Sequence, residues 1–217
     1  MKIEGIIFDL DGTLLDTLED IADTANQMLR KHGFPIHELN EYRYLVGDGI
    51  KTLIYRSLPA ENRQEQTIQD CLITYREYYE RNWNVHTQPY AGVPELLQAL
   101  AKTPLKTAVL SNKKHEFTVR CAQAFLPDHA FALVLGHREG KSALKPDPAC
   151  ALEIAQQLGI APERFLFMGD TGIDMQTALA AGMFPVGALW GFREKEELLQ
   201  SGAKAIIAQP LELLKLL

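Results

Sequence analysis

Residues 6–12, Ile-Ile-Phe-Asp-Leu-Asp-Gly, decide the fold of this chain. The three consecutive apolar residues predict a buried strand, and Asp9 and Asp11 follow at its end. Because a strand rises about 3.3 Å per residue, the two carboxylates would lie within roughly 7 Å of each other in an extended backbone. Gly12 allows a turn in which backbone N–H groups approach an anion. A plain turn is the simpler interpretation, but an apolar strand that ends in two acids favours a site.

Short apolar runs alternate with helical patterns along most of the remaining sequence. The expected strands are residues 3–9, 106–111, 131–135, 164–168, 184–189 and 204–207. The helices expected between them are residues 94–102, 114–125, 148–158, 173–181 and 194–200. This alternation predicts an α/β fold, a doubly wound parallel sheet of the Rossmann-like type with helices on both faces.

One long stretch interrupts this alternation and contains only helical patterns. Its apolar residues recur at helical spacing over 18–29, 50–58 and 68–79. We therefore expect a helical domain inserted just after the first strand. The expected domains are an α/β catalytic core of residues 1–15 and 83–217, and a helical cap domain of residues 16–82.

Four polar clusters follow expected strands, at residues 9–13, 111–113, 145–146 and 170–174. Because the carboxyl ends of parallel strands meet at one edge of a sheet, these distant clusters would come together there. The acids gathered in this way are Asp9, Asp11, Asp170 and Asp174. Helix capping is the simpler role for Asp170. Four acids at one edge would repel one another without a cation, however, and oxygen donors without a histidine favour Mg²⁺ over Zn²⁺.

Ser111, Asn112 and Lys145 indicate that the same edge also binds an anion. The first two residues follow a strand and could donate hydrogen bonds, and the lysine stands directly before a helix. The combination predicts phosphoryl transfer, in which Asp9 attacks phosphorus and forms an aspartyl-phosphate. Asp11 would protonate the leaving oxygen and then take a proton from water. A bound Mg²⁺ and the lysine would offset the repulsion between carboxylate and phosphate.

Four stretches resemble the motifs of the haloacid dehalogenase-like (HAD) hydrolase superfamily and occur in that family's order. They are residues 9–17 (DLDGTLLDT), 110–113 (LSNK), 145–148 (KPDP) and 169–174 (GDTGID). The helical insertion is similar to the small cap that this family carries between its first and second motifs. Within the superfamily the chain most resembles phosphoglycolate phosphatases, through residues 46–49 (VGDG) and 111–113 (SNK). Pyrophosphatases and nucleotidases of the superfamily look similar here and stay open as alternatives.

The resemblance implies a role for each residue of the gathered clusters. Asp9 would be the nucleophile and a metal ligand, and Asp11 the acid/base with its backbone carbonyl on the metal. The phosphate would be held by Ser111, Asn112 and Lys145. Asp170 would bind Mg²⁺, and Asp174 would support the metal shell. The presence of Asp11 separates the chain from the dehalogenase branch, which needs no metal.

Bulk properties favour a cytoplasmic globular protein, and the predicted phosphoryl chemistry makes a small phosphorylated metabolite its expected partner. The net charge is −6, and no basic run indicates a nucleic-acid partner. Three widely spaced cysteines, Cys71, Cys121 and Cys150, are typical of reduced thiols rather than of a disulfide scaffold. No apolar run approaches the roughly 20 residues that span a bilayer, so no membrane contact is expected. The sequence leaves the oligomeric state open, a monomer included.

Two other functions use the same chemical groups. A sugar-phosphate mutase would pass the phosphoryl group from Asp9 to a sugar hydroxyl, and glucose 1-phosphate would then give an isomer rather than inorganic phosphate. A non-enzymatic phospho-acceptor module would keep an acid cluster and Mg²⁺ for signalling. Such modules lack the helical insertion and the second acid two residues after the first, which disfavours this interpretation.

Overall fold

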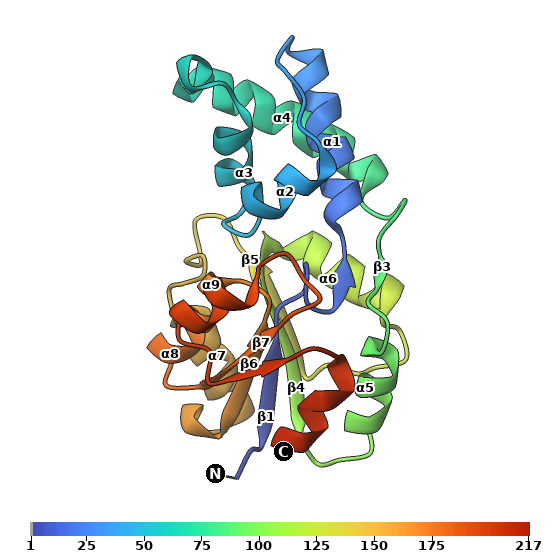
Figure 1. Ribbon diagram of the computed structural model, residues 1–217, viewed down its shortest axis with the longest axis vertical. Helices are drawn as coiled ribbons and strands as arrows, with labels where there is room; N and C mark the ends of the chain where they lie inside the picture. The colour runs from blue at the N-terminus through green and yellow to red at the C-terminus, as the bar shows by residue number, and fades with distance from the viewer. Residues whose placement is uncertain (1) are drawn as a thin grey trace. The chain divides into compact units, whose positions relative to one another are not determined.

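Two compact units make up the chain, and the computed structural model describes residues 2–217 of it (Figure 1). The core unit comprises the chain up to Leu15 together with Pro89–Leu217, and the cap unit comprises Asp16–Gln88. The sequence analysis expected the second part of the core domain to begin at residue 83. In the structure the N–H groups of His86 and Thr87 donate to the carboxylate of Asp20, at 2.8 and 2.9 Å, which attaches this segment to the cap unit.

The core unit contains a six-stranded sheet in the order β5-β4-β1-β6-β7-β8, and neighbouring strands run parallel. The strands are β1 (Gly5–Phe8), β4 (Lys106–Lys114), β5 (Leu133–His137), β6 (Phe165–Gly169), β7 (Phe184–Ala188) and β8 (Ala205–Ile207). The helices are α5 (Val93–Leu100), α6 (His115–Phe125), α7 (Ala149–Leu158), α8 (Gly172–Ala180) and α9 (Lys195–Gln200). Helices α5 and α6 lie on one side of the sheet, and α7 and α8 lie on the other (Figure 1). The α/β fold expected from the sequence is confirmed.

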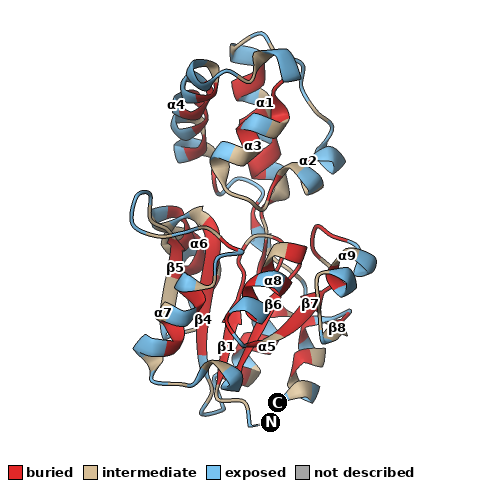
Figure 2. Ribbon diagram, turned by 90° about the vertical axis from the view of Figure 1, so that its left-hand side faces the viewer, coloured by how far each residue is buried: buried red, intermediate tan, exposed pale blue. Residues whose placement is uncertain are grey.

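Strand β1 lies at the centre of the sheet, between β4 and β6. All four of its residues are buried, as Figure 2 shows for the middle of the sheet. On one face, Ile7 packs with residues of α7 and α8, including Ile154 and Ala178. Burial of each large apolar side chain contributes roughly 1.5–3 kcal/mol to folding. This packing holds the carboxyl end of β1, where Asp9 follows, in a rigid setting.

Strand β4 continues past the predicted end at Ser111 and reaches Lys114. Its pairing with β5 shifts register between Leu110 and Lys114, which marks a bulge or similar irregularity. Irregularities of this kind redirect side chains at the ends of strands. The shift falls on Ser111, Asn112 and Lys113, the polar cluster at the end of this strand.

The cap unit contains four α-helices among its described residues: α1 (Leu18–Lys31), α2 (Leu39–Leu45), α3 (Ile50–Ser57) and α4 (Glu65–Asn82). The three apolar patterns predicted α1, α3 and α4. The sequence analysis missed α2, because Tyr42 is its one buried residue and it carries no apolar stripe. A reciprocal capping box between Glu38 and Glu41 stabilises its first turn.

Short elements complete the two units. The chain passes between the units at two short strands, β2 (Leu15–Asp16) and β3 (Gln88–Pro89). These two strands pair with each other in a two-stranded sheet. The 3₁₀ turns are η1 (Ala60–Asn62), η2 (Pro162–Arg164) and η3 (Pro210–Leu216). Among residues 2–217, none of the helices combines the length and the apolar character needed to cross a bilayer.

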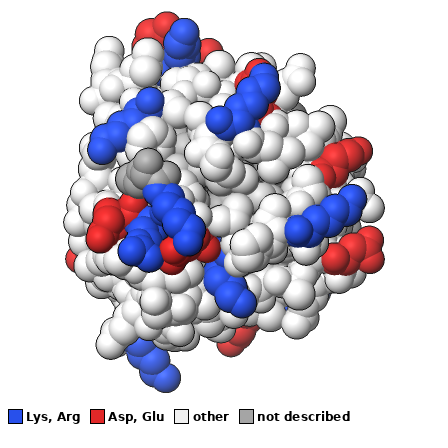
Figure 3. All heavy atoms as spheres, turned by 90° about the horizontal axis from the view of Figure 1, so that it is seen from below, with Lys and Arg blue, Asp and Glu red and all other residues white. Residues whose placement is uncertain are grey.

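Basic and acidic side chains are mixed on the face of the core unit at the amino ends of the strands (Figure 3). Glu4 lies 3.4 Å from the ammonium group of Lys2 and 3.0 Å from the guanidinium of Arg164. Exposed pairs of this kind contribute little, typically less than about 1 kcal/mol.

Candidate active site

Asp9 and Asp170 meet because the strands that precede them are neighbours. Phe8 of β1 is in register with Met168 of β6, and the N–H of Asp9 donates to the carbonyl of Met168 at 2.9 Å. Asp174 comes from the first turn of α8. One carboxylate oxygen from each of the three aspartates lies within 4.8 Å of the other two, and all three residues are buried. The structure therefore brings together three of the four acids that the sequence analysis expected at this edge of the sheet.

Lys145 lies between two of these carboxylates. Its ammonium group is 2.8 Å from Asp9 Oδ1 and 2.6 Å from Asp174 Oδ1. Burial acts to lower the pKa of Lys145, but the charges of Asp174 and Asp9 outweigh it and raise that pKa above its ordinary value. The lysine is therefore held as a buried cation beside the expected nucleophile.

Asn112 contacts the backbone of Lys145 through both ends of its amide group. Its Oδ1 accepts from the N–H of Lys145 at 2.8 Å, and its Nδ2 donates to the carbonyl of Lys145 at 3.2 Å. These two hydrogen bonds fix where the lysine side chain begins. Ser111 is buried one position earlier on β4, and its hydroxyl accepts from the N–H of Lys113 at 3.1 Å.

The capping box of α8 orients Asp174. Thr171 is the N-cap residue, and its N–H and hydroxyl donate to Asp174 Oδ2 at 3.1 and 2.7 Å. The other carboxylate oxygen of Asp174 accepts from Lys145. Asp174 is thus held by the helix on one side and by the lysine on the other, with Asp170 one residue before the cap.

The balance of charge in this cluster favours a bound cation. Burial and the nearby charge of Asp174 raise the pKa of Asp9 well above its usual range, and the same causes raise the pKa of Asp170 to about 7. Three buried carboxyl groups lie beside the one ammonium group of Lys145, so ionisation of all three requires further positive charge. The donors are all oxygen atoms, which is the set that Mg²⁺ prefers. The residues present therefore fit a hard divalent cation, with Asp9 and Asp170 as its candidate ligands.

Asp11 is more exposed than Asp9 and has a different cationic partner. The ammonium group of Lys113 donates to both carboxylate oxygens of Asp11, at 2.7 and 3.0 Å. The side chain of Lys113 is itself 7% exposed. Asp11 is thus paired with Lys113 and Asp9 with Lys145, although the two aspartates are only two residues apart in sequence.

The family model for haloacid dehalogenase-like hydrolases matches residues 6–188 of the chain. The chain belongs to this family. The superfamily expected from the four motifs is therefore confirmed, and the hydrolase class with it.

Relatives and solved structures match the hydrolase over nearly its whole length. It is 33% identical to the phosphoglycolate phosphatase of Nitrosospira multiformis, over 100% of this chain and 96% of the relative. It is 30% identical to the N-acetylmuramic acid 6-phosphate phosphatase of Pseudomonas aeruginosa, again over 100% of this chain and 96% of the relative. A predicted phosphoglycolate phosphatase from Haemophilus somnus 129pt has a TM-score of 0.91 and 27% identity, covering 100% of this chain and 98% of that one.

The structure adds residues of the hydrolase to which the sequence analysis assigned no role. The hydroxyl of Thr13 donates to Asp170 Oδ1 at 2.8 Å, and the N–H of Phe192 donates to Asp170 Oδ2 at 2.8 Å. Thr13 and Lys113 lie within the motifs at residues 9–17 and 110–113, so the sequence already indicated that they are near the site. Phe192 contributes through its backbone, and a backbone contact leaves no trace in residue type.

Gly12 takes the backbone conformation that the turn after β1 requires. Its φ is +85°, a left-handed value that favours glycine. A side chain here would also meet Asp170, because a Cβ atom would lie 2.3 Å from Asp170 Oδ2. The turn expected from the sequence thus brings backbone, rather than a side chain, against the acid cluster.

Two basic residues of the cap unit, Lys51 and Arg56, lie on helix α3. Both have acidic partners inside the cap unit: Lys51 lies 2.7 Å from Glu65, and Arg56 lies 2.6 Å from Asp48. Asp48 belongs to the turn at residues 46–49, so Arg56 stabilises that turn.

Proposed function

We propose that this hydrolase is a Mg²⁺-dependent phosphatase that acts on a small phosphomonoester through an aspartyl-phosphate. The observation that carries the proposal is the buried cluster in which Asp9 lies within reach of both Lys145 and the carboxylate of Asp170. Phosphatases among the relatives support the same reaction class. Phosphoglycolate is the first candidate substrate, because a relative with this activity is 33% identical over the whole chain.

Asp9 is the proposed nucleophile. An oxygen of its carboxylate attacks phosphorus, the bond from phosphorus to the leaving oxygen breaks, and Asp11 supplies the proton that this oxygen takes up. In the second step Asp11 accepts a proton from water while the water oxygen attacks phosphorus, which releases Asp9 and inorganic phosphate. The ammonium group of Lys113 donates to Asp11 Oδ1 at 2.7 Å and thereby orients the carboxyl group that exchanges these protons.

Lys145 is the proposed phosphate-binding cation, with Ser111 and Asn112 beside it. A carboxylate that approaches a phosphate dianion meets strong repulsion, and a buried ammonium group in a water-poor site reduces it more than an exposed one would. The hydrogen bonds from Asn112 to the backbone of Lys145 support an additional positioning role for the amide. Direct contact of Asn112 with phosphate remains a prediction.

The proposed metal ligands are the carboxylates of Asp9 and Asp170 and the backbone carbonyl of Asp11, with Asp174 supporting them. When bound, Mg²⁺ would supply positive charge that neutralises the phosphoryl oxygens. The protein itself must hold these oxygen donors in position for the metal. Thr13, Phe192 and the capping box of α8 do so through the hydrogen bonds described above.

A cytoplasmic location is part of the proposal. Cys71, Cys121 and Cys150 are free and buried, as expected of thiols in a reducing compartment. The proposed partner is a small phosphorylated metabolite rather than a nucleic acid or a membrane.

The direct test is release of inorganic phosphate from a panel of phosphomonoesters, with Mg²⁺ and with EDTA. Phosphoglycolate should rank first, and N-acetylmuramic acid 6-phosphate is the rival that the second relative suggests. The Asp9→Asn variant keeps the shape of the side chain and should lower kcat by at least about a thousandfold. Asp128→Asn, on the exposed surface of the core, is the matched control and should leave kcat unchanged. Turnover by the Asp9→Asn variant at the wild-type rate would contradict the mechanism, whichever substrate is used.

A further inference from the structure

The connection between β7 and α9 contains a segment, Trp190-Gly191-Phe192, that contacts the acid cluster. We call these three residues the strap. They lie just beyond residues 6–188, the part of the chain that matches the family model. Because β7 is the neighbour of β6 in the sheet, the connection that follows β7 starts beside Asp170, which follows β6.

The strap reaches Asp170 by two routes. The backbone N–H of Phe192 donates directly to Asp170 Oδ2 at 2.8 Å. The indole N–H of Trp190 donates to the carbonyl of Thr13 at 2.9 Å, and the hydroxyl of Thr13 donates to Asp170 Oδ1 at 2.8 Å. Each carboxylate oxygen of Asp170 therefore accepts one hydrogen bond, either from the strap itself or from Thr13, which the strap contacts. A carboxylate oxygen has two lone pairs, so a metal can still bind.

Gly191 brings the strap into backbone contact with both partners. A Cβ atom on this residue would lie 2.3 Å from Asp170 Cβ and 2.3 Å from the carbonyl oxygen of Gly12. These distances are far shorter than any contact that a side chain can make, so only glycine fits. Asp170 is thus enclosed by the backbone of the strap on one side and by the turn at Gly12 on the other.

The residue that follows the strap is attached to the helix beside the site. Arg193 Nε lies 3.3 Å from Glu197 Oε2, and the other oxygen of Glu197 accepts from the N–H of Gly172 at 3.1 Å. Gly172 is the first residue of α8, which carries Asp174. The connection is therefore fixed to β1's loop at one end and to α8 at the other.

We propose that the strap positions the Asp170 carboxylate for metal binding and that Trp190 is its positioning residue. The inference rests on the proposed function, because it requires Mg²⁺ at this cluster. Mg²⁺ demands near-ideal ligand geometry, so the direction in which Asp170 points affects affinity. Groups that orient a metal ligand typically change affinity by about 10–100-fold when they are removed.

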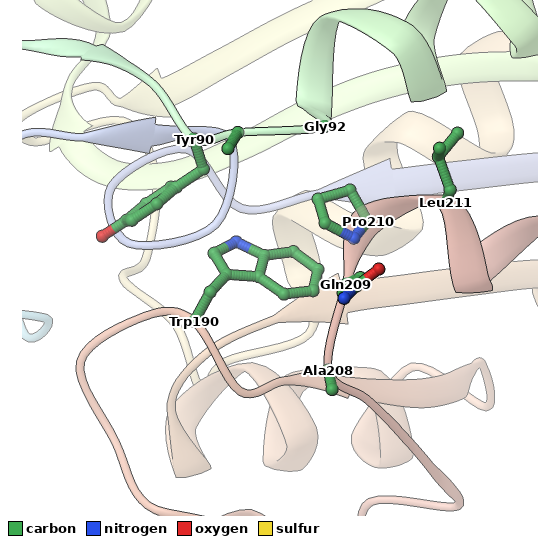
Figure 4. A pocket seen from close by; sticks show the side chains of 8 residues that line it. Tyr90, Gly92, Trp190, Ala208, Gln209, Pro210 and Leu211 are labelled. Atoms are coloured by element: carbon green, nitrogen blue, oxygen red, sulfur yellow. The ribbon is translucent and has the colours of Figure 1, made fainter.

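The surroundings of Trp190 separate this role from simple packing. Its indole lies between Tyr90 and Pro210 and borders an open pocket of about 440 Å³, which Gln209 and Leu211 also line (Figure 4). A ring that borders open space is not needed to fill a closed core. Phenylalanine in its place keeps most of the apolar contact and removes only the N–H that binds Thr13.

The test is calorimetric titration of Mg²⁺ into the full chain, without substrate, for the wild type and for Trp190→Phe. We expect the dissociation constant for Mg²⁺ to rise about tenfold in the variant, while its melting temperature in EDTA stays close to that of the wild type. Trp83→Phe, in the cap unit, is the matched control and should bind Mg²⁺ like the wild type. An affinity of Trp190→Phe within twofold of the wild type would overturn the proposal.

A second measurement covers the case in which Trp190→Phe does not fold. The chain contains two tryptophans, so Trp83→Phe leaves Trp190 as the one indole fluorophore. The fluorescence emission of Trp190 should change when Mg²⁺ is added and return to its starting value when EDTA is added. Emission that saturating Mg²⁺ leaves unchanged would contradict the proposal that the strap positions Asp170. Wild-type protein that binds no Mg²⁺ would contradict both the proposed function and the role of the strap. Equal Mg²⁺ affinity of the wild type and Trp190→Phe would contradict only the role of the strap.

Discussion

Among the described residues, each unit contains one cluster with the residue types and spacing of a metal site. In the core unit it is Asp9, Asp170 and Asp174, and in the cap unit it is Glu19, Asp23 and His86. In both clusters the candidate ligand atoms lie within 4.8 Å of one another. The core residues are all buried, whereas the cap residues are all exposed.

Burial, rather than proximity, separates the two clusters. Two unit charges 4 Å apart interact by about 1 kcal/mol in water and by about 4 kcal/mol at the effective dielectric constant of a protein site. In the cap, water screens Glu19 and Asp23, and His86 lies 3.7 and 3.9 Å from them. In the core, the buried ammonium group of Lys145 lies against Asp9 and Asp174, and its one positive charge does not balance three carboxylates. Only the core cluster therefore has a strong physical requirement for a cation.

The largest difference between buried and exposed charge should appear when a lysine is removed. Lys145→Met leaves Asp9 and Asp174 buried without their cation, and we expect the free energy of unfolding in EDTA to fall by about 3–5 kcal/mol. Lys51→Met removes an exposed partner of Glu65 and should cost less than about 1 kcal/mol. Urea denaturation measures both. Equal losses of stability in the two variants would contradict the argument that burial strengthens the interaction of charges in the core cluster.

Mg²⁺ should stabilise the protein through the core cluster and not through the cap cluster. At one hundred times its dissociation constant, a ligand that binds only the folded state raises the free energy of unfolding by about 2.7 kcal/mol. Asp170→Asn should abolish this gain, whereas His86→Gln should retain it. Thermal melts with increasing Mg²⁺ give the answer, and loss of the Mg²⁺ effect in His86→Gln would place the ion in the cap.

The smallest expected effect compares two aspartates on the same helix, α1. Asp20 is buried and accepts from the N–H groups of His86 and Thr87 and from the hydroxyl of Thr87, at 2.8, 2.9 and 2.6 Å. Asp20→Ala should lower the free energy of unfolding by about 2 kcal/mol, because buried donors lose a charged acceptor. Asp23→Ala, three residues later on the exposed side, should change it by less than about 0.5 kcal/mol. Chemical denaturation of the two variants tests this, and a larger loss for Asp23→Ala would contradict it.

Much of the fold could be predicted because its elements have strong local patterns. The six strands of the core sheet are short apolar runs, and the pattern over residues 6–8 marks the central strand without reference to the rest of the chain. Helix α2 was missed because a short helix with one buried residue, Tyr42, has no apolar stripe. The extension of β4 to Lys114 was missed because its last residues are polar.

For the candidate site, the sequence predicted which residues take part but not which contacts they make with one another. Asp9, Asp170, Asp174 and Lys145 were predicted from their places at the ends of strands, and the structure brings them together. Lys145 pairs with Asp9 and Asp174, while Lys113 pairs with Asp11. This could not be predicted, since Lys113 near the end of β4 and Lys145 after β5 are both placed at the same edge of the sheet. The contact of Phe192 with Asp170 could not be predicted either, because every residue except proline has a backbone N–H.

The sequence by itself determined which residue types stand at the ends of the parallel strands, and hence the family and the general chemistry. Hydrophobic periodicity and short motifs are local, so they can be recognised one segment at a time. The tertiary structure alone decided which charges lose their water and which backbone groups approach Asp170. Burial and close approach depend on segments that are distant in sequence, and they make the core cluster, unlike the cap cluster, a candidate metal site.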